Sequence, residues 1–379
     1  MAHYEMRKFV APEFIFGIGA RHRVGFYAQN MQARRVLIVT DPGVTAAGWL
    51  AELIENLDES GIPSVVFDAV TPNPKDTEVM AGAARYRDEG CDVIVALGGG
   101  SVIDCAKGIG IVSANGGSIL DYEGVDRIPR PCPPLICIPT TAGTSADISQ
   151  FAIINNIGKR YKIAIISKSV VPDVALVDPE TTTTMSPYLT ACTGLDALTH
   201  AIEAYVSTAS SPVVDVHALA AIALVNAHLP TAIVEPGNTE ARENMALASL
   251  QAGLAFSNAS LGAVHAMAHS LGGYLDMAHG ESNALLLDHV IRCNFAAASD
   301  RYQRIGTMMG IQGANERTLT AAIATLREHC GIRDGLAARG VTRGSIEDLA
   351  PHAERDACIF TNPRRASLAD LKTIYAEAL

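Results

Sequence analysis

The sequence predicts an α/β domain followed by an all-helical domain, and two patterns in its 379 residues support this division. In the first half, short apolar, β-branched runs alternate with helix-length amphipathic stretches, which predicts a mostly parallel sheet with helices on both faces. In the second half, apolar residues recur at helical spacing. We therefore expect one domain at residues 1–184 and a second at 185–379, divided where turn and cap residues predominate.

Each expected element follows from one of these two patterns. Buried strands are expected at residues 35–40, 64–67, 92–97, 135–138 and 174–177. Helices are expected between the strands at 46–60 and 77–89, and in the second half at 191–206, 213–229, 239–256, 263–274, 318–330 and 367–378.

The composition excludes several classes of partner. The net charge is −11 and Lys and Arg form no block, so we expect neither nucleic acid nor an anionic membrane surface as a partner. The uncharged run at 244–275 is long enough to span a bilayer, but it contains His, Asn, Gln, Ser and Gly. Buried helices around a site explain this run better than a membrane span.

The cysteines and the first residues indicate a compartment. Eight cysteines are scattered through the chain without a Cys-x-x-Cys pair, which is typical of reduced core thiols. Residues 1–10 lack the apolar stretch of a signal peptide. We therefore expect a cytoplasmic protein.

Four side chains form a candidate metal site. Asp196 and His200 lie four residues apart, so on a helix they project from one face and can bind one ion together. His265 and His279 would complete a four-ligand set. One carboxylate and three imidazoles suit Fe(II), Zn(II), Co(II) or Ni(II), and ligand type alone does not separate iron from zinc. Taken alone, the Asp-His pair is more often explained by hydrogen bonding on a helix surface than by metal binding.

A glycine-rich turn is a candidate phosphate-binding loop. Gly98, Gly99, Gly100 and Ser101 follow an expected strand and open an expected helix that contains Asp104. Glycines let backbone N–H groups approach a pyrophosphate at the positive end of a helix. Because the turn lacks the Gly-x-Gly-x-x-Gly fingerprint, a simple strand-to-helix turn remains an alternative.

Two further segments end expected strands at the same edge of the sheet. Asp41 can accept hydrogen bonds from an adenosine ribose and repel a 2′-phosphate, which favours NAD over NADP; alternatively it is a turn residue. The loop with Thr140, Thr141 and Thr144 offers hydroxyl groups where ligands collect in open α/β sheets, or it caps a helix.

Taken in order, these motifs resemble the iron-containing (group III) alcohol dehydrogenases, a family that includes lactaldehyde reductases and 1,3-propanediol dehydrogenases. The resemblance covers essentially the whole chain. It is carried by Phe14-Ile-Phe-Gly-Ile-Gly19, Thr71-Pro-Asn-Pro74, the Gly-Gly-Gly-Ser turn, Pro139-Thr-Thr-Ala-Gly-Thr144, Thr193-Gly-Leu-Asp-Ala-Leu-Thr-His200, the region from His265 to His279, and Thr361-Asn-Pro-Arg364.

The resemblance implies a dehydroquinate synthase-like fold: a dinucleotide-binding α/β domain, an all-helical metal-binding domain, and an active site between them. It implies Asp196, His200, His265 and His279 as metal ligands and His269 near the nicotinamide, either as a proton relay or as a core histidine. The implied cofactor-lining residues are Asp41, Asn73, Gly99, Gly100, Ser101, Thr140, Thr141, Thr144, Lys162 and Leu189, and the implied substrate pocket is Phe151, Phe256 and Cys358.

The implied activity is reversible hydride transfer between NAD and a short-chain primary alcohol or diol, with Fe(II), or else Zn(II), as the metal. The implied assembly is a homodimer or higher oligomer, through the segment around Phe14. Phe151 departs from relatives that have a polar residue there, so it would shrink and dry the pocket. A glycerol-like polyol dehydrogenase, a dehydroquinate synthase-like non-redox enzyme and a non-enzymatic NAD-binding assembly protein are the alternatives.

Overall fold

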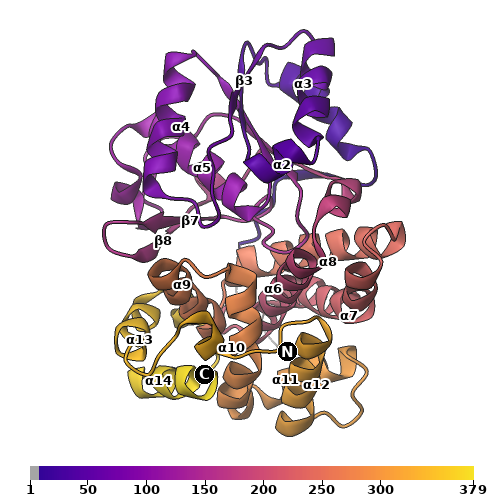
Figure 1. Cartoon of the computed structure of the whole chain (residues 1–379), viewed down its shortest axis with the longest axis vertical. Coiled ribbons are helices and arrows are strands. Elements are labelled where there is room, and N and C mark those ends of the chain that lie inside the picture. Colours follow the sequence, from indigo (N-terminus) through magenta and orange to yellow (C-terminus); the bar gives the residue numbers. More distant parts are fainter. Residues whose placement is uncertain (1–7) are drawn as a thin grey trace, which may run out of the picture.

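The computed structural model of the protein describes residues 8–379. Residues 1–7, on which the signal-peptide expectation partly rests, lie outside the described residues. Figure 1 shows the α/β part, coloured indigo to magenta, above the helical part, coloured salmon to yellow.

The larger sheet has six parallel strands in the order β1-β9-β6-β4-β2-β3. The expected strands are all present, and β1 at one edge is an addition that the strand pattern did not predict. The bounds are β1 Glu13–Phe16, β2 Val36–Val39, β3 Ser64–Phe67, β4 Val93–Gly98, β6 Leu135–Pro139 and β9 Val174–Val177.

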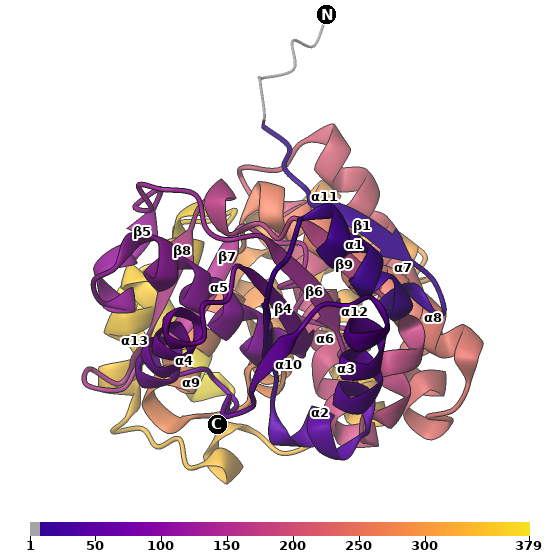
Figure 2. The same cartoon turned by 90° about the horizontal axis from the view of Figure 1, so that it is seen from above.

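Helices cover both faces of this sheet, as predicted. Leu37 and Val39 of β2 contribute to one apolar core, and Val36 and Ile38 contribute to another, because successive side chains of a strand point to opposite faces. Figure 2 shows α4 and α5 on one side of β4 and α1 and α3 on the other. The helices of this half are α1 Val24–Asn30, α2 Pro42–Ala46, α3 Trp49–Glu59, α4 Asp76–Asp88 and α5 Gly100–Asn115, with 3-10 turns η1 Ala20–Arg23, η2 Ile119–Tyr122, η3 Lys168–Val170 and η4 Pro179–Thr184.

A second, three-stranded sheet lies beside the first and was not predicted. Its strands are β5 Gly124–Val125, β7 Phe151–Asn156 and β8 Tyr161–Ile166, in the order β5-β8-β7. The strands β7 and β8 form an antiparallel hairpin. This hairpin lies where the α/β part meets the helical part, with α9 packed against β8 (Figure 1).

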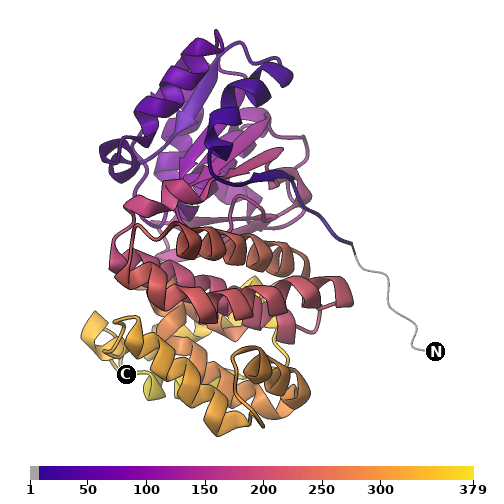
Figure 3. The same ribbon diagram turned by 90° about the vertical axis from the view of Figure 1, so that its right-hand side faces the viewer.

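The second half is helical, as predicted, although α10, α11 and α13 were not expected. Its helices are α6 Pro187–Val206, α7 Pro212–Val234, α8 Thr239–Ala259, α9 Ala263–Leu275, α10 His279–Asn294, α11 Ser299–Met308, α12 Glu316–His329, α13 Ile346–Arg355 and α14 Leu368–Glu377, with 3-10 turns η5 Phe295–Ala297, η6 Leu336–Arg339 and η7 Ala357–Thr361. In the side view of Figure 3 these helices stack below the sheet.

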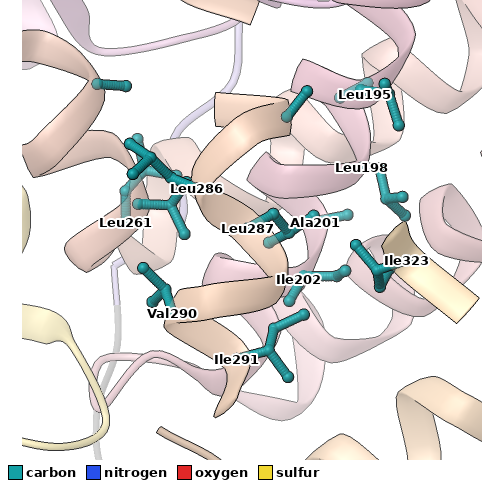
Figure 4. Close-up of a cluster of buried hydrophobic side chains, with 14 of the residues drawn as sticks. Leu195, Leu198, Ala201, Ile202, Leu261, Leu286, Leu287, Val290, Ile291 and Ile323 are labelled. Carbon is teal, nitrogen blue, oxygen red and sulfur yellow. The ribbon is translucent and has the colours of Figure 1, made fainter. Parts of the chain in front are cut away.

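One apolar core holds the helical half together. Leu195, Leu198 and Ile202 of α6 meet Leu287 and Ile291 of α10 in this core (Figure 4). Because Asp196 and His200 lie in the middle of α6 and His279 begins α10, this packing sets the distance between these metal-ligand candidates. Among the described residues, only α7 has the length and composition of a membrane-crossing helix, and it packs against α6 and α8.

We propose the domain boundary between residues 184 and 185. The last strand of the sheet, β9, ends at Val177, and the 3-10 turn η4 ends at Thr184. Ser186 then caps α6, accepting a hydrogen bond from the N–H of Leu189 at 3.2 Å, with Pro187 as the first helical residue.

Candidate active site

Four candidate ligands converge at one point below the sheet. Asp196 and His200 come from α6, His265 comes from the first turn of α9, and His279 is the first residue of α10. The Nε2 atoms of His265, His279 and His200 lie 3.6, 3.8 and 3.9 Å from Oδ1 of Asp196. One ligand atom from each residue lies within 4.8 Å of all the others, which is the spacing expected around a single ion.

Hydrogen bonds fix the tautomers of two of these imidazoles. Nδ1 of His200 lies 3.3 Å from the carbonyl oxygen of Gly143, and Nδ1 of His265 lies 2.6 Å from Oε2 of Glu203. Because both partners accept, each Nδ1 carries a hydrogen, and in the neutral form of each ring Nε2 keeps a lone pair. Lone pairs and a carboxylate that face one point fit a divalent cation.

Burial and charge set the protonation of the four groups. Burial lowers the pKa of His200 to about 3 and that of His279 well below its usual value, so both imidazoles are neutral, as ligation requires. Burial alone would raise the pKa of Asp196, but the neighbouring histidines outweigh it and lower the pKa. For His265, hydrogen bonds with Asp196 and Glu203 outweigh burial and raise the pKa to about 9, so a bound metal must displace its Nε2 proton.

Glu203 connects α6 to α9. Its carboxylate accepts the N–H of Val264 at 2.7 Å and that of His265 at 3.4 Å, in addition to Nδ1 of His265. Gly262 precedes the helix, and an added Cβ there would lie 2.8 Å from Glu203 Oε1 and 2.8 Å from Asn362 Oδ1. A side chain at 262 would therefore displace the groups that cap α9.

Asn283, one turn after His279, also contacts the ligands. Its Nδ2 lies 2.6 Å from Asp196 Oδ1 and 3.1 and 3.3 Å from Nε2 of His265 and His279. Its Oδ1 has no hydrogen-bond partner among the described residues. The amide therefore lies at the place on which the ligand lone pairs converge.

A cleft of about 630 Å³, including its open mouth, leads from this point toward the sheet. The predicted residues that line it are Asn73, Gly100, Ser101, Asp104, Thr144, Phe151, Lys162, His200, Phe256, His265, His269 and His279. The predicted residues outside its lining are Asp41, Gly98, Gly99, Thr140, Thr141, Leu189, Asp196 and Cys358. The structure thus brings three of the four metal-ligand candidates and half of the cofactor candidates to one cleft, with Asp196 directly behind the three histidines.

The glycine turn is packed closely against the threonine loop. A Cβ on Gly100 would lie 2.6 Å from Thr144 Oγ1, and one on Gly99 would lie 3.1 Å from Thr141 Cγ2. The turn begins α5 with Gly99 as its first flanking residue. Close approach, rather than unusual backbone angles, therefore requires glycine here, and the turn remains a candidate phosphate site at a helix N-terminus.

Polar and charged residues line the cofactor end of the cleft. Burial raises the pKa of Asp104 to about 6 and lowers that of Lys162 to about 8, and each charge partly offsets the shift of the other. Asn73 Nδ2 donates to Asp276 Oδ1 at 2.7 Å. This hydrogen bond joins a loop of the first domain to the end of α9.

Asp41 is an N-cap residue. Its Oδ1 accepts the N–H groups of Gly43 at 2.7 Å and Val44 at 2.9 Å and so caps α2. The turn interpretation is therefore confirmed as a local role. The expected contact with an adenosine ribose stays a prediction.

The candidate substrate pocket is aromatic. Phe256 stacks on His200 with ring centroids 4.3 Å apart, and Phe151 lies against Phe256 at 5.8 Å. Lys107, a buried residue of α5, donates to the carbonyl oxygens of Ser149 at 2.9 Å and Phe151 at 2.7 Å and so holds the start of β7. Cys358 is fully buried, and burial raises its pKa well above the usual range.

Sequence reasoning missed three residues that support the site: Glu203, Asn283 and Asp356. Glu203 lies seven residues after Asp196 and Asn283 lies four after His279, so helical spacing could have identified both. Asp356 contacts His269 from far along the chain, and no local pattern signals it.

An α/β domain above a helical domain, with a His₃Asp set at the bottom of the cleft, defines a class of metal-dependent, nucleotide-linked enzymes. Comparison with known proteins identifies the family. Residues 11–179 match "Iron-containing alcohol dehydrogenase", and residues 190–379 match "Fe-containing alcohol dehydrogenase family, C-terminal".

Individual relatives match over their full lengths. The NAD-dependent methanol dehydrogenase of Bacillus methanolicus is 39% identical, with 98% of this chain and 99% of that protein covered. The crystal structure of a 1,3-propanediol oxidoreductase matches with a TM-score of 0.95 at 40% identity, covering 99% of this chain and 100% of that one. The sulfoacetaldehyde reductase of Bifidobacterium kashiwanohense, solved with NAD+, matches with a TM-score of 0.88 at 33% identity, with 99% of each chain covered.

The chain belongs to the iron-containing alcohol dehydrogenase family. It is therefore an oxidoreductase of alcohols and aldehydes, and the family implies iron and NAD as its metal and cofactor. The predicted fold class and enzyme class are confirmed.

Proposed function

We propose that this protein interconverts short-chain primary alcohols or diols and their aldehydes, with NAD(H) as the hydride carrier. Asp196, His200, His265 and His279 hold Fe(II), and Zn(II) fits the same donors. When bound, the metal supplies Lewis acidity toward the alcohol or aldehyde oxygen, and NAD exchanges the hydride.

The chain's own residues bind, orient and exclude water. The glycine turn and Ser101 bind the pyrophosphate at the start of α5, and Asn73, Asp104, Thr144 and Lys162 surround the rest of the cofactor. The more distant candidates Asp41, Thr140, Thr141 and Leu189 contact the part of the dinucleotide that extends beyond the cleft. His269 Nε2 accepts the alcohol proton.

The observation that carries this proposal is the position of the ligand quartet at the bottom of an aromatic cleft. Phe256 covers one ligand by stacking on His200. Phe151 and Phe256 line the cleft with apolar rings, which favours a short carbon chain over water. In such a site the field of a cation acts with little screening by solvent.

The proposal is tested by anaerobic NADH formation from 1-propanol, 1,2-propanediol and 1,3-propanediol, using chelated protein reloaded separately with Fe(II) or Zn(II). We expect turnover that depends on the metal, and the metal that restores it identifies the native ion. Stoichiometric metal and bound NAD without turnover of any alcohol or aldehyde would instead favour a non-redox enzyme of the same architecture.

Phe151 selects monohydric alcohols over diols. Because an apolar ring cannot hydrogen-bond a second hydroxyl group, Phe151→Asn should raise the kcat/KM ratio of 1,2-propanediol to 1-propanol about 10-fold. Phe151→Leu is the matched control, since it enlarges the pocket without adding a polar group. Equal diol preference in the two variants would show that pocket size alone decides specificity.

Asp41 rejects NADP. Asp41→Asn keeps an oxygen for the N–H groups of Gly43 and Val44 but removes the negative charge, so kcat/KM for NADP relative to NAD should rise about 10-fold. Asp41→Gly should act in the same direction, at a cost of a few tenths of a kcal/mol from the lost cap. Steady-state kinetics with both cofactors measures this, and an unchanged ratio would leave Asp41 as a cap residue only.

We also propose a cytoplasmic homodimer or higher homo-oligomer. The strand β1 lies at an open edge of the sheet, and Phe14, Phe16 and Ile18 are exposed there. All eight cysteines are free thiols, which supports a reducing compartment. Light scattering after size exclusion tests the assembly, and Phe16→Lys should shift it toward monomer.

A further inference from the structure

Among residues 8–379, the His269 side chain has one hydrogen-bond partner, and that partner comes from a distant segment. His269 lies one turn after His265 on α9 and lines the cleft. Its ring is nearly parallel to that of His279, with centroids 5.2 Å apart and planes at 16°. Nδ1 of His269 lies 2.8 Å from Oδ2 of Asp356. The ring is therefore held from its face by His279 and from its edge by Asp356.

The two carboxylate oxygens of Asp356 have different partners. Oδ1 accepts the N–H of Cys358 at 2.8 Å, which caps the 3-10 turn η7, and Oδ2 faces His269. Both side chains of the pair are nearly buried, at 6% and 9% exposure. Burial alone would raise the pKa of Asp356, but His269 and the N–H of Cys358 outweigh it and lower the pKa, so the group is a carboxylate.

A carboxylate only accepts hydrogen bonds, so Nδ1 of His269 must carry a hydrogen. In the neutral imidazole, Nε2 is then the acceptor. Nε2 lies across the ring from Asp356. In this tautomer it can accept a hydrogen bond from a hydroxyl group of the substrate or of the nicotinamide ribose, whereas in the other tautomer it could not.

We propose that Asp356 is a positioning residue for alcohol oxidation, holding His269 in the Nδ1–H tautomer so that Nε2 is the acceptor for a hydroxyl group in the cleft. The inference rests on the proposed function, and it adds a residue that acts only through His269. The group in contact with substrate or cofactor is His269, and Asp356 sets its orientation and hydrogen-bond polarity.

The test is Asp356→Asn, because an amide can still contact both Cys358 and His269 but reverses the direction of the hydrogen bond with His269. Its Oδ1 still caps Cys358, so η7 stays in place, while Nδ2 now donates toward His269 and favours the Nε2–H tautomer. We expect kcat to fall roughly 100-fold, in the same direction as when an orienting carboxylate is replaced in other enzymes, with metal content unchanged. Asp356→Ser keeps a cap oxygen but does not reach His269, so its kcat should lie between that of Asp356→Asn and that of the wild type.

The tautomer itself is read by nitrogen NMR of the Zn(II)-loaded protein labelled with 15N-histidine, with the His269 signals assigned by their loss in His269→Gln. Wild type should show Nδ1–H and Asp356→Asn should show Nε2–H. Asp173→Asn is the control, since Asp173 accepts the N–H of Leu135 at 2.8 Å in the sheet and should change neither signal nor turnover.

Two results would overturn the inference: wild-type kcat in Asp356→Asn, or an Nε2–H tautomer in the wild-type holoenzyme. The NMR measurement needs no turnover, so it separates a failure of this inference from a failure of the proposed function. If no alcohol is oxidised, the proposed function fails, while the tautomer still reports whether Asp356 orients His269.

Discussion

Replacing His265 by alanine should abolish metal binding and turnover together. Its Nε2 faces Asp196 at 3.6 Å, and the three remaining donors form an incomplete set. Losing one of four ligands should weaken metal affinity at least about 100-fold and lower kcat by at least about 1,000-fold. The metal is counted by mass spectrometry after dialysis, and turnover is measured anaerobically with added Fe(II).

The fold should survive this change at a moderate cost. Glu203 would lose its contact with Nδ1 of His265 but keep the N–H groups of Val264 and residue 265. We expect about 1–3 kcal/mol of lost stability, measured by denaturant unfolding of the metal-free proteins. His228→Ala, at a partly buried histidine of α7, is the matched control and should keep metal and activity. Normal metal content and turnover in His265→Ala would refute the ligand assignment.

The ligand quartet was predictable because its signals are local or chemically rare. The four-residue spacing of Asp196 and His200 needs only a helix, and α6 provides it. His265 and His279 stand out as imidazoles in or next to an uncharged segment. The strands of the large sheet were predictable for a similar reason, since parallel strands that are buried on both faces leave continuous apolar runs, as in Val36–Val39.

The elements that were missed carry weaker or misleading patterns. Nearly every residue of α10 from Glu281 to Ile291 is buried, so apolar side chains do not alternate with polar ones at helical spacing, and Gly280 and Asn283 interrupt the pattern. The hairpin β7–β8 turns through residues 157–160, where Arg160 adopts a positive φ of 55°. Arginine is not a typical turn residue, so the sequence does not indicate this conformation. Asp356 reaches His269 only through tertiary packing.

Glu203 should prove almost as important to the metal as a ligand, although it does not contact the ion. It fixes the Nδ1–H tautomer of His265 through the 2.6 Å hydrogen bond and caps α9 through the N–H groups of Val264 and His265. In Glu203→Gln, the Nε2 group of the amide is a donor, and it faces either Nδ1–H of His265 or the backbone N–H groups, which are also donors. If the amide Nε2 faces His265, Nδ1 must accept and the imidazole takes the Nε2–H tautomer. Nε2 then has no lone pair with which to bind the metal. We therefore expect metal affinity to fall about 10- to 100-fold.

Glu203→Ala removes the acceptors altogether, so two backbone N–H groups and Nδ1 of His265 lose their partner in a buried site. We expect about 2–4 kcal/mol of lost stability, which thermal and denaturant unfolding of the metal-free protein would measure. Glu281→Gln is the matched control: Glu281 is equally buried, but its carboxylate pairs with Arg339 at 2.7 Å and contacts no candidate ligand. If both glutamine variants lost metal equally, a general effect of buried charge would explain the loss; if only Glu203→Gln does, the carboxylate acts through the tautomer of His265.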